Sequence, residues 1–311
     1  MRNLTFFSLS LMDILLKVLH LTLNKLGMKI ALPLVFILSL LLHCEVLQSQ
    51  KTPGNIISSG YPNGTLIIIG GGSDDDLIMR EFIKYAGGES AKIVFIPTAM
   101  DDNELRSDPD FSQIKKSFEK GGVKNITILH TRDKSQANDE KFIEPLKTAT
   151  GILFGGGRQW RIADGFLNTK AHKEMFNLLD RGGVIAGSSA GATIQGSYLA
   201  RGDTKNNQIM MGDHEIGLGF LKNVAIDQHV LARNRQFDMF DILKNRPGLL
   251  GIGIDENTAI VVKGDVFEVI GKSYVLIYDK SFWSREGSDL KNLPDKSALF
   301  YFLKSGDRYN L

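Results

Sequence analysis

A run of five small residues, Gly187-Ser188-Ser189-Ala190-Gly191, carries the strongest chemical signal in the sequence. Read as G-x-S-x-G, it places Ser189 between an apolar segment and a helix-compatible one. A nucleophilic serine on a sharp strand-to-helix turn needs small neighbours, and the helix N-terminus favours a developing oxyanion. The run therefore predicts a nucleophile at Ser189, with Ser188 as the next candidate. A plain turn with a capping serine is the alternative.

A catalytic serine needs a base, and four histidines lie beyond the first 50 residues. His172 falls within an amphipathic segment and is expected at the surface. His214 lies in a polar loop and is not expected to bind metal. His130 and His229 each end a predicted strand, and open α/β sheets place their sites at the carboxyl ends of strands. Both are candidate bases, although a single histidine is more often structural than catalytic.

Three further strand ends carry polar or glycine-rich turns. Asp255-Glu256 could supply the acid that orients a base, but on its own this pair indicates only a polar turn. Gly155-Gly156-Gly157 could present backbone N–H groups to an oxyanion. Gly70-Gly71-Gly72 is not a dinucleotide-binding fingerprint, because the carboxylates of 74–76 would repel a pyrophosphate. The acidic clusters lack His or Cys partners at ligand spacing, so no metal is expected.

Apolar runs of strand length alternate with amphipathic segments from residue 65 onward. Strands are expected at 65–69, 92–97, 126–130, 151–154 and 184–186. Helices are expected at 75–86, 111–120 and 171–179, with a helix-compatible run at 192–199. Near-continuous apolar strands separated by helices predict an α/β fold, with a mostly parallel sheet covered by helices on both faces.

After residue 205 the pattern changes to short strands separated by turns. A strand at 224–227 and a helix at 237–243 are expected first. The later strands are expected at 252–254, 259–262, 266–270, 274–278 and 298–303. Such strands favour an antiparallel C-terminal extension. With the Gly-, Pro- and Ser-rich residues 51–64 read as a linker, a single α/β domain is predicted for 65–311.

The first 50 residues are predicted to be a targeting region. Within 28–49, a basic residue, an apolar run and a polar exit match a secretory signal better than a membrane span of about 20 residues. Cys44 is the only cysteine, so the folded domain has no thiol nucleophile and no disulfide. Cys44 is either removed with the signal or takes a lipid, which is the only membrane attachment expected. His43, directly before it, disfavours a lipoprotein. The predicted location is periplasmic or extracellular.

Composition and charge narrow the class of partner. Apolar residues make up 43% and charged residues 23% of the chain, as in soluble globular proteins. The net charge is +2, and the part after residue 50 carries 33 basic and 33 acidic residues. A neutral body offers no electrostatic footprint for nucleic acid, which is therefore not an expected partner.

Four motifs, in their order along the chain, resemble those of the serine peptidase family that contains cyanophycinase and aspartyl dipeptidase E. They are Gly156-Gly157-x-Gln159, Gly187-Ser188-Ser189-Ala190-Gly191-Ala192, Asp227-Gln228-His229 and Gly253-Ile254-Asp255-Glu256-Asn257-Thr258-Ala259. The resemblance covers about residues 65–280, and the last two motifs are more similar to cyanophycinases than to the dipeptidases. It implies a flavodoxin-like fold related to class I glutamine amidotransferases, with serine in place of their cysteine.

The resemblance also implies roles for particular residues. Ser189 would be the nucleophile, His229 the base and Glu256 the acid that orients the base. The oxyanion would meet backbone N–H groups of Ala190, Gly156 and Gly157. The positions that resemble the family's substrate pocket are Gln159, Asp227, Gln228, Arg233 and Arg235. Such enzymes release β-Asp-Arg dipeptides from multi-L-arginyl-poly-L-aspartate (cyanophycin) without metal or cofactor, so the expected partner is a peptide substrate, and a homodimer is a further expectation.

Two departures from the family pattern fall near the expected pocket. Arg158 stands where the family usually has Asp or Asn, and Asp238 where it often has a third arginine. The resemblance therefore supports the family's reaction more directly than the family's substrate. The leading hypothesis is a secreted serine exopeptidase for β-Asp-Arg-type bonds. The alternatives are an aspartyl or isoaspartyl dipeptidase that does not act on polymer, and a non-catalytic binding protein of the same fold, against which the three retained positions argue.

Overall fold

The computed structural model describes residues 58–72, 76–280 and 299–311. The predicted targeting region, with Cys44, lies outside these residues, as does the expected linker up to residue 57. In the rest of that linker, Ser59 forms an isolated antiparallel bridge with Lys222. No helix in the described ranges is long and apolar enough to cross a membrane.

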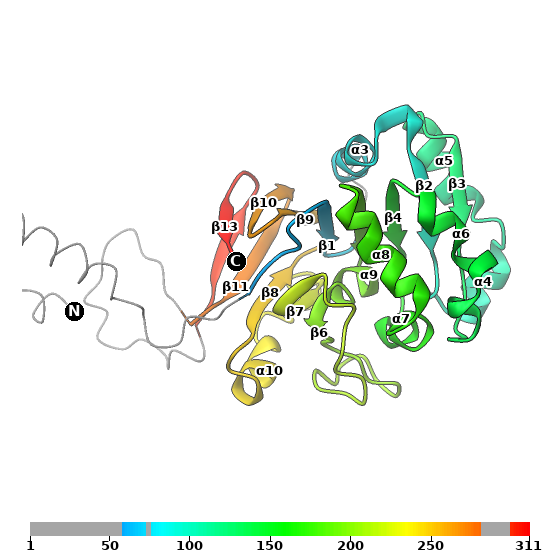
Figure 1. Cartoon of the computed structure of the whole chain (residues 1–311). Helices are drawn as coiled ribbons and strands as arrows, with labels where there is room; N and C mark the ends of the chain where they lie inside the picture. Colours follow the sequence, from blue (N-terminus) through cyan, green and yellow to red (C-terminus); the bar gives the residue numbers. More distant parts are fainter. Residues whose placement is uncertain (1–57, 73–75, 281–298) are drawn as a thin grey trace, which may run out of the picture. The chain divides into compact units, whose positions relative to one another are not determined.

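An eight-stranded sheet carries the segment that leads to Ser189 (Figure 1). Its strand order is β13-β10-β9-β1-β5-β4-β2-β3. The parallel strands are β1 (Thr65–Ile69), β5 (Val184–Ser188), β4 (Gly151–Phe154), β2 (Lys92–Ile96) and β3 (Asn125–Ile128). The antiparallel strands are β9 (Thr258–Lys263), β10 (Val266–Gly271) and β13 (Arg308–Asn310). Because β1 pairs with both β5 and β9, early and late parts of the chain share this sheet.

A second sheet of five strands has the order β12-β11-β8-β7-β6. Its strands are β6 (Gly196–Tyr198), β7 (Leu221–Gln228), β8 (Leu250–Ile254), β11 (Tyr274–Tyr278) and β12 (Tyr301–Lys304). The pairs β6–β7 and β7–β8 are parallel, and the two others are antiparallel. The register aligns Gln228 with Ile254, so β7 and β8 end side by side at the same edge.

Helices cover both faces of the eight-stranded sheet, because the side chains of its buried strands point alternately to opposite faces. Along β1, Ile67 and Ile69 pack with α3 and α5, whereas Leu66 and Ile68 pack with α6, α7 and α8. These helices are α3 (Asp76–Tyr85), α5 (Ser112–Lys120), α6 (Glu140–Thr148), α7 (Gln159–Phe166) and α8 (Lys170–Asp180). A short helix, α4 (Asp102–Ser107), follows β2.

The two sheets share one apolar core. The cluster that contains Leu66 and Ile68 of β1 also contains Ile226 of β7 and Ile254 of β8. On its other face the five-stranded sheet packs against α10 (Met239–Asn245) in a separate cluster around Tyr278. This common core holds the carboxyl ends of β5, β7 and β8 in a fixed relation to one another.

The predicted fold class is confirmed: the parallel strands, the helices on both faces and the antiparallel C-terminal strands are all present. The late strands, however, divide between two sheets. The helix-compatible run 192–199 also forms less helix than expected, since α9 spans only Ala190–Thr193 and β6 follows it. A Cβ on Gly196 would lie 2.8 Å from the Val224 carbonyl oxygen, so this glycine permits close pairing of β6 with β7. Tertiary pairing overrides the local preference here.

Candidate active site

Ser189 occupies a strained turn between β5 and α9. Its backbone angles, φ 55° and ψ −112°, lie in a region that a non-glycine residue rarely adopts. Its N–H donates to the Ile69 carbonyl oxygen of the neighbouring strand over 3.0 Å. A side chain on Gly187 would overlap the backbone of Gly191, and one on Gly191 would approach the Phe154 carbonyl oxygen to 2.5 Å. Small residues are therefore required on both sides of the serine, as the G-x-S-x-G pattern predicts.

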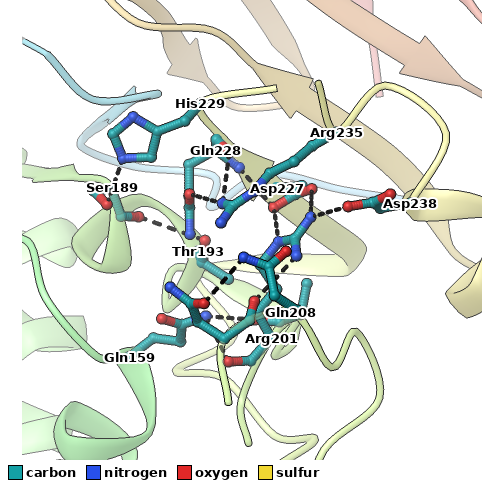
Figure 2. Close-up of polar contacts among 12 residues, drawn as sticks. Gln159, Ser189, Thr193, Arg201, Gln208, Asp227, Gln228, His229, Arg235 and Asp238 are labelled. Atoms are coloured by element: carbon teal, nitrogen blue, oxygen red, sulfur yellow. Dashed lines mark hydrogen bonds and ion pairs between the residues drawn. The ribbon is translucent and has the colours of Figure 1, made fainter. Parts of the chain in front are cut away.

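His229 reaches Ser189 from the second sheet. It directly follows β7, its φ is 54°, and its N–H donates to the Gly70 carbonyl oxygen over 3.0 Å. This turn brings the Nε2 of His229 to 2.9 Å from the Oγ of Ser189 (Figure 2). Serine and histidine, 40 residues apart in the sequence, thus form the contact that a nucleophile and its base require.

The two adjacent acids after β8 have different contacts. Glu256 Oε1 lies 2.6 Å from Nδ1 of His229. Asp255 is buried and turns the other way, where its Oδ1 accepts the N–H groups of Leu231 and Ala232 in the loop that follows the histidine. Glu256 contacts the imidazole directly, whereas Asp255 holds the loop beside it.

The hydrogen-bond pattern determines the state of the imidazole. A carboxylate can only accept a hydrogen bond, so Nδ1–H of His229 donates to Glu256, and Nε2 of the neutral ring accepts from the Ser189 hydroxyl. Burial lowers the pKa of His229; Arg233 and Arg235 add to this effect, while Glu256 opposes it. A neutral imidazole at neutral pH is the form that can take a proton from serine.

The glycine run after β1 packs against the base and its acid. Any Cβ on Gly71, whose φ is 126°, would overlap the His229 ring. One on Gly72 would lie 2.7 Å from Oε2 of Glu256. The Asn257 N–H also donates to the Gly71 carbonyl oxygen over 2.8 Å. Sequence reasoning only excluded a nucleotide-binding role for this run, and its position at a strand end was the available signal.

The groups expected to bind the oxyanion lie around the serine. A Cβ on Gly156 would be 3.5 Å from the Cβ of Ser189, so the backbone of this turn runs beside the nucleophile. No hydrogen bond within the described part of the chain uses the N–H groups of Gly156 or Gly157. Ala190 is the first residue of α9, where a helix leaves its N–H without an intrahelical acceptor. Their role in binding an oxyanion stays a prediction.

Four of the five residues expected to line the pocket are buried. The Gln159 side chain is 1% exposed and donates to the carbonyl oxygens of 200–201 over 2.7 and 2.9 Å. Arg235 is 3% exposed, and its Nη1 lies 2.8 Å from Oε1 of Gln228. Arg233, in contrast, is exposed. Figure 2 shows the four buried residues on the same side of the site as the serine and histidine. Of the five, Arg233 is the one whose side chain is exposed to solvent.

Asp227 is part of a buried ion-pair network that the sequence motifs did not indicate. Arg201 is fully buried and donates through Nε and Nη2 to the two carboxylate oxygens of Asp227, over 2.7 and 2.9 Å. Its Nη2 also lies 2.6 Å from Oδ2 of Asp238, one of the two departures noted in the sequence (Figure 2). A substrate guanidinium would therefore find the Asp227 carboxylate already occupied.

Two of the other histidines, His130 and His172, make structural contacts away from Ser189. His130 lies three strands away from β5 in the sheet order, and its Nδ1 is 3.1 Å from the Thr98 hydroxyl. His172 was expected at the surface, but it is half-buried against the Phe176 ring, with Nε2 2.9 Å from the Leu218 carbonyl oxygen. That expectation was wrong because the imidazole packs between the rings of Phe176, on the same helix, and Phe220. Neither histidine contacts Ser189.

His214 lies between two carboxylates. Its Nδ1 is 2.9 Å from Asp213 and its Nε2 is 3.0 Å from Asp164. Although burial opposes the change, these carboxylates raise the pKa of His214. In the described ranges, no cluster of three His, Cys, Asp or Glu side chains could hold a metal ion.

An α/β fold in which a serine, a histidine and a glutamate meet at three strand ends defines a serine-type hydrolase. The chain belongs to peptidase family S51, whose family model matches residues 66–270. It is a serine-type peptidase of the cyanophycinase type, and the resemblance seen in the sequence motifs is confirmed.

Individual relatives agree with this assignment. The chain is 32% identical over 263 residues to a cyanophycinase of Geminocystis herdmanii (strain PCC 6308). This alignment covers 80% of this chain and 94% of that protein. The chain is 29% identical to a cyanophycinase of Trichormus variabilis (strain ATCC 29413 / PCC 7937), over 79% of this chain and 86% of the relative. A crystal structure of a peptidase from an acI-B1 Actinobacterium has the same fold, with a TM-score of 0.60 and 24% identity over 81% of this chain and 98% of that one.

Proposed function

We propose that this protein is an exopeptidase that hydrolyses aspartyl bonds of the β-Asp-Arg type through an acyl-enzyme. The observation that carries the proposal is the continuous hydrogen-bonded relay from Glu256 through His229 to Ser189. The similarity to cyanophycinases supports the substrate class. A binding protein would have no need of a base and an acid aligned on a strained serine.

The proposed reaction follows from the state of each group. Ser189 Oγ attacks the scissile carbonyl carbon while Nε2 of His229 takes its proton, and Glu256 stabilises the imidazolium that forms. The carbonyl oxygen becomes negative and meets the N–H groups of Ala190 and the 156–157 turn. When the C–N bond breaks, His229 returns the proton to the leaving amine. Water, deprotonated by His229, then attacks the acyl-enzyme. The ester C–O bond breaks, the acid leaves, and His229 returns the proton to Ser189 Oγ.

Arg233 is the residue that we assign to a substrate carboxylate. It is exposed and lies one turn beyond the base, since its N–H donates to the His229 carbonyl oxygen over 2.9 Å. A guanidinium can bind a carboxylate through two parallel hydrogen bonds, which a lysine ammonium cannot form. Arg235, buried on Gln228, would act by holding the loop in place. Arg233→Lys should therefore raise KM although the charge is kept.

The nucleophile is tested by replacing Ser189 with Ala. Turnover should fall by about 10⁴-fold or more, because the remaining groups cannot form an acyl-enzyme. Ser188→Ala is the matched control, since Ser188 ends β5 and pairs with Ile69. Labelling by a fluorophosphonate should follow the same pattern. Full activity of the Ser189 variant and none of the Ser188 variant would transfer the role to Ser188.

The substrate class is tested with purified protein and four substrates: cyanophycin and the peptides β-Asp-Arg, β-Asp-Lys and α-Asp-Arg. Mass spectrometry of the products should show β-Asp-Arg released from the polymer. Cleavage of the dipeptides alone would instead identify an isoaspartyl or aspartyl dipeptidase. Binding without cleavage of any of the four, and without fluorophosphonate labelling, would identify a binding protein.

We also propose that the protein is exported. The proposal rests on the sequence of 28–49, with its basic start, apolar run and polar exit. Mass spectrometry of the mature N-terminus should find a chain that begins near residue 50, or one that begins at Cys44 with the added mass of a lipid. A cytoplasmic protein that retains residues 30–42 would contradict export.

A further inference from the structure

Three arginines lie at the end of the eight-stranded sheet where Ser189 also lies, beyond the carboxyl ends of the parallel strands. Arg158 and Arg161 follow β4, and Arg132 follows β3, so all three lie beyond carboxyl ends of parallel strands. Two of them meet on one acceptor, because the Met100 carbonyl oxygen lies 2.7 Å from Nη1 of Arg161 and 2.6 Å from Nη2 of Arg132. We call Arg132, Arg158 and Arg161 the cationic row. Because Arg132 and Arg161 share an acceptor, their guanidinium groups are neighbours.

The cationic row begins next to the nucleophile and runs away from it. Strand order places β4 beside β5, then β2 and then β3 at the sheet edge. Figure 1 labels β4, β2 and β3 in this order. Arg158 directly follows the glycine turn at 156–157 that borders Ser189. Its N–H donates to the Ala99 carbonyl oxygen over 2.8 Å, which connects this turn to the loop after β2. A chain bound at Ser189 and extended in this direction would pass over the arginines.

The positive charge of the row is poorly compensated. Among the described residues, Asp102 is the only carboxylate paired with any of the three, through Arg132. The Asp101 carboxylate instead caps α4 by accepting the backbone N–H groups of 103–104. Within the described residues, Arg158 donates to the Asp203 carbonyl oxygen, and Arg161 donates to those of Ala99 and Met100. Arg106, on α4, adds a further positive charge near both acids.

Partial burial makes these charges stronger ligands for an anion. In the described structure, the Nε atoms of all three guanidinium groups are buried without a hydrogen-bond partner. Burial lowers the pKa of Arg161, with Arg132 and Arg158 adding to the effect and Asp101 and Asp102 opposing it. The groups are thus close enough to repel one another. An incoming carboxylate would relieve this repulsion and would be less screened than at a fully hydrated site.

We propose that the cationic row binds carboxylates of an extended acidic peptide, outside the residue that is cleaved. The inference rests on the proposed function, and it assigns to that site a preference for long carboxylate-rich substrates. Arg158 is central to it, because it directly follows the glycine turn beside Ser189 and so connects the row to the nucleophile. Each guanidinium still has N–H groups that can donate to a carboxylate in a forked geometry.

The first experiment measures binding without turnover. The Ser189→Ala protein is titrated against a fluorescein-labelled deca-L-aspartate peptide, with fluorescence anisotropy as the readout. The Ser189→Ala protein should bind this peptide, with an affinity that falls as the salt concentration rises. Adding Arg132→Gln and Arg158→Asn together should weaken binding about tenfold or more and flatten the salt dependence. Arg308→Gln, on β13 at the far end of the sheet, is the matched control and should change neither.

Unchanged affinity in the double variant, or equal binding of a labelled deca-serine peptide, would overturn the proposal. Thermal unfolding checks that the double variant is folded. Should it not fold, Arg132→Glu alone serves instead, because that side chain is 30% exposed and its reversal should also weaken binding. Arg161 is left intact because it packs over Trp160 and holds the 99–100 backbone.

The second experiment separates this inference from the proposed function. With Ser189 present, the double variant should show a KM for cyanophycin, which carries a free α-carboxylate on each arginyl group, about tenfold higher, with kcat unchanged. The KM for a two-unit fragment, (β-Asp-Arg)2, should stay the same. An equal KM change on both substrates would contradict the row as a distal site. If the wild-type protein cleaves none of them, the proposed function fails, and the anisotropy measurement still decides whether the row binds carboxylates.

Discussion

At the scale of single residues, opposing influences act on the pKa of His229, and their balance decides whether the imidazole is neutral. Burial and the positive charges of Arg233 and Arg235 disfavour its protonated form, and Glu256 favours it. The net effect holds the pKa below its usual value, so the imidazole is neutral and ready to accept a proton at neutral pH. Because Arg233 is exposed, one side chain influences both the base and, by our proposal, the substrate carboxylate.

The pH dependence of activity should report these influences. His229 must be neutral, so kcat/KM should fall as the pH drops through its pKa, which places the acid limb below about pH 6.5. Arg233→Gln removes a positive charge, which should raise this pKa and move the acid limb to higher pH. Arg233→Lys should leave the limb near its original position, since the charge is kept. Measuring kcat/KM from pH 4.5 to 8 for the three proteins is the check, and a shift to lower pH in the glutamine variant would contradict it.

At the scale of elements, the turns after four strands assemble the site. The turn after β1 supplies the glycines that face His229 and Glu256, and the turn after β5 supplies Ser189. The turns after β7 and β8 supply the base and the acid. Positive φ angles at Ser189, His229 and Asn257 show that three of these turns are strained, and such strain persists where surrounding contacts hold it.

Gly71→Ala should therefore damage activity more than stability. The added methyl group would overlap the His229 ring and displace it from Ser189, so kcat should fall about 100-fold or more, as when a catalytic group is misplaced by about 1 Å. Gly88→Ala is the control, because Gly88 also has a positive φ but a Cβ there meets nothing within 4 Å. Kinetics and urea unfolding of both variants give the comparison. Equal loss of activity in the two would mean that backbone strain alone, and not contact with the base, is responsible.

At the scale of the whole molecule, the site belongs to both sheets at once. Ser189 follows a strand of the eight-stranded sheet, and His229 and Glu256 follow strands of the five-stranded one. A single apolar cluster packs residues of β1, β7 and β8 together, so the relative position of nucleophile and base depends on the common core. We expect the two sheets to unfold as one unit.

Ile226→Ala tests this expectation. Ile226 is fully buried on β7, and truncating it should cost about 2–5 kcal/mol of the free energy of unfolding. The urea midpoints for activity and for far-UV circular dichroism should move down together, because the loss acts on the core that both sheets share. Lys244→Ala on α10, an exposed position, should leave both midpoints in place. Separate shifts of the two midpoints would show that the sheets unfold independently.

The sequence alone determined the features that depend on local patterns. Alternating apolar runs and amphipathic segments predicted the parallel strands and their helices, because a strand buried on both faces is apolar throughout. The small residues around Ser189 predicted its turn, since only such residues fit between a strand and the helix that follows. Motif order then identified the family and proposed His229 and Glu256.

Tertiary structure decided what depends on strand order and register. From the chain alone, His130 and His229 both ended strands, but only the strand after which His229 lies reaches the serine, through the core that joins the two sheets. Strand position alone likewise did not distinguish Asp255 from Glu256, which only the resemblance singled out, and the loop geometry places Glu256 against the base. No local pattern linked Arg201 to Asp227, since that ion pair spans 26 residues and forms only when β7 is buried beside the loop after β6. Long-range contacts of this kind are set by packing, which a single sequence does not record.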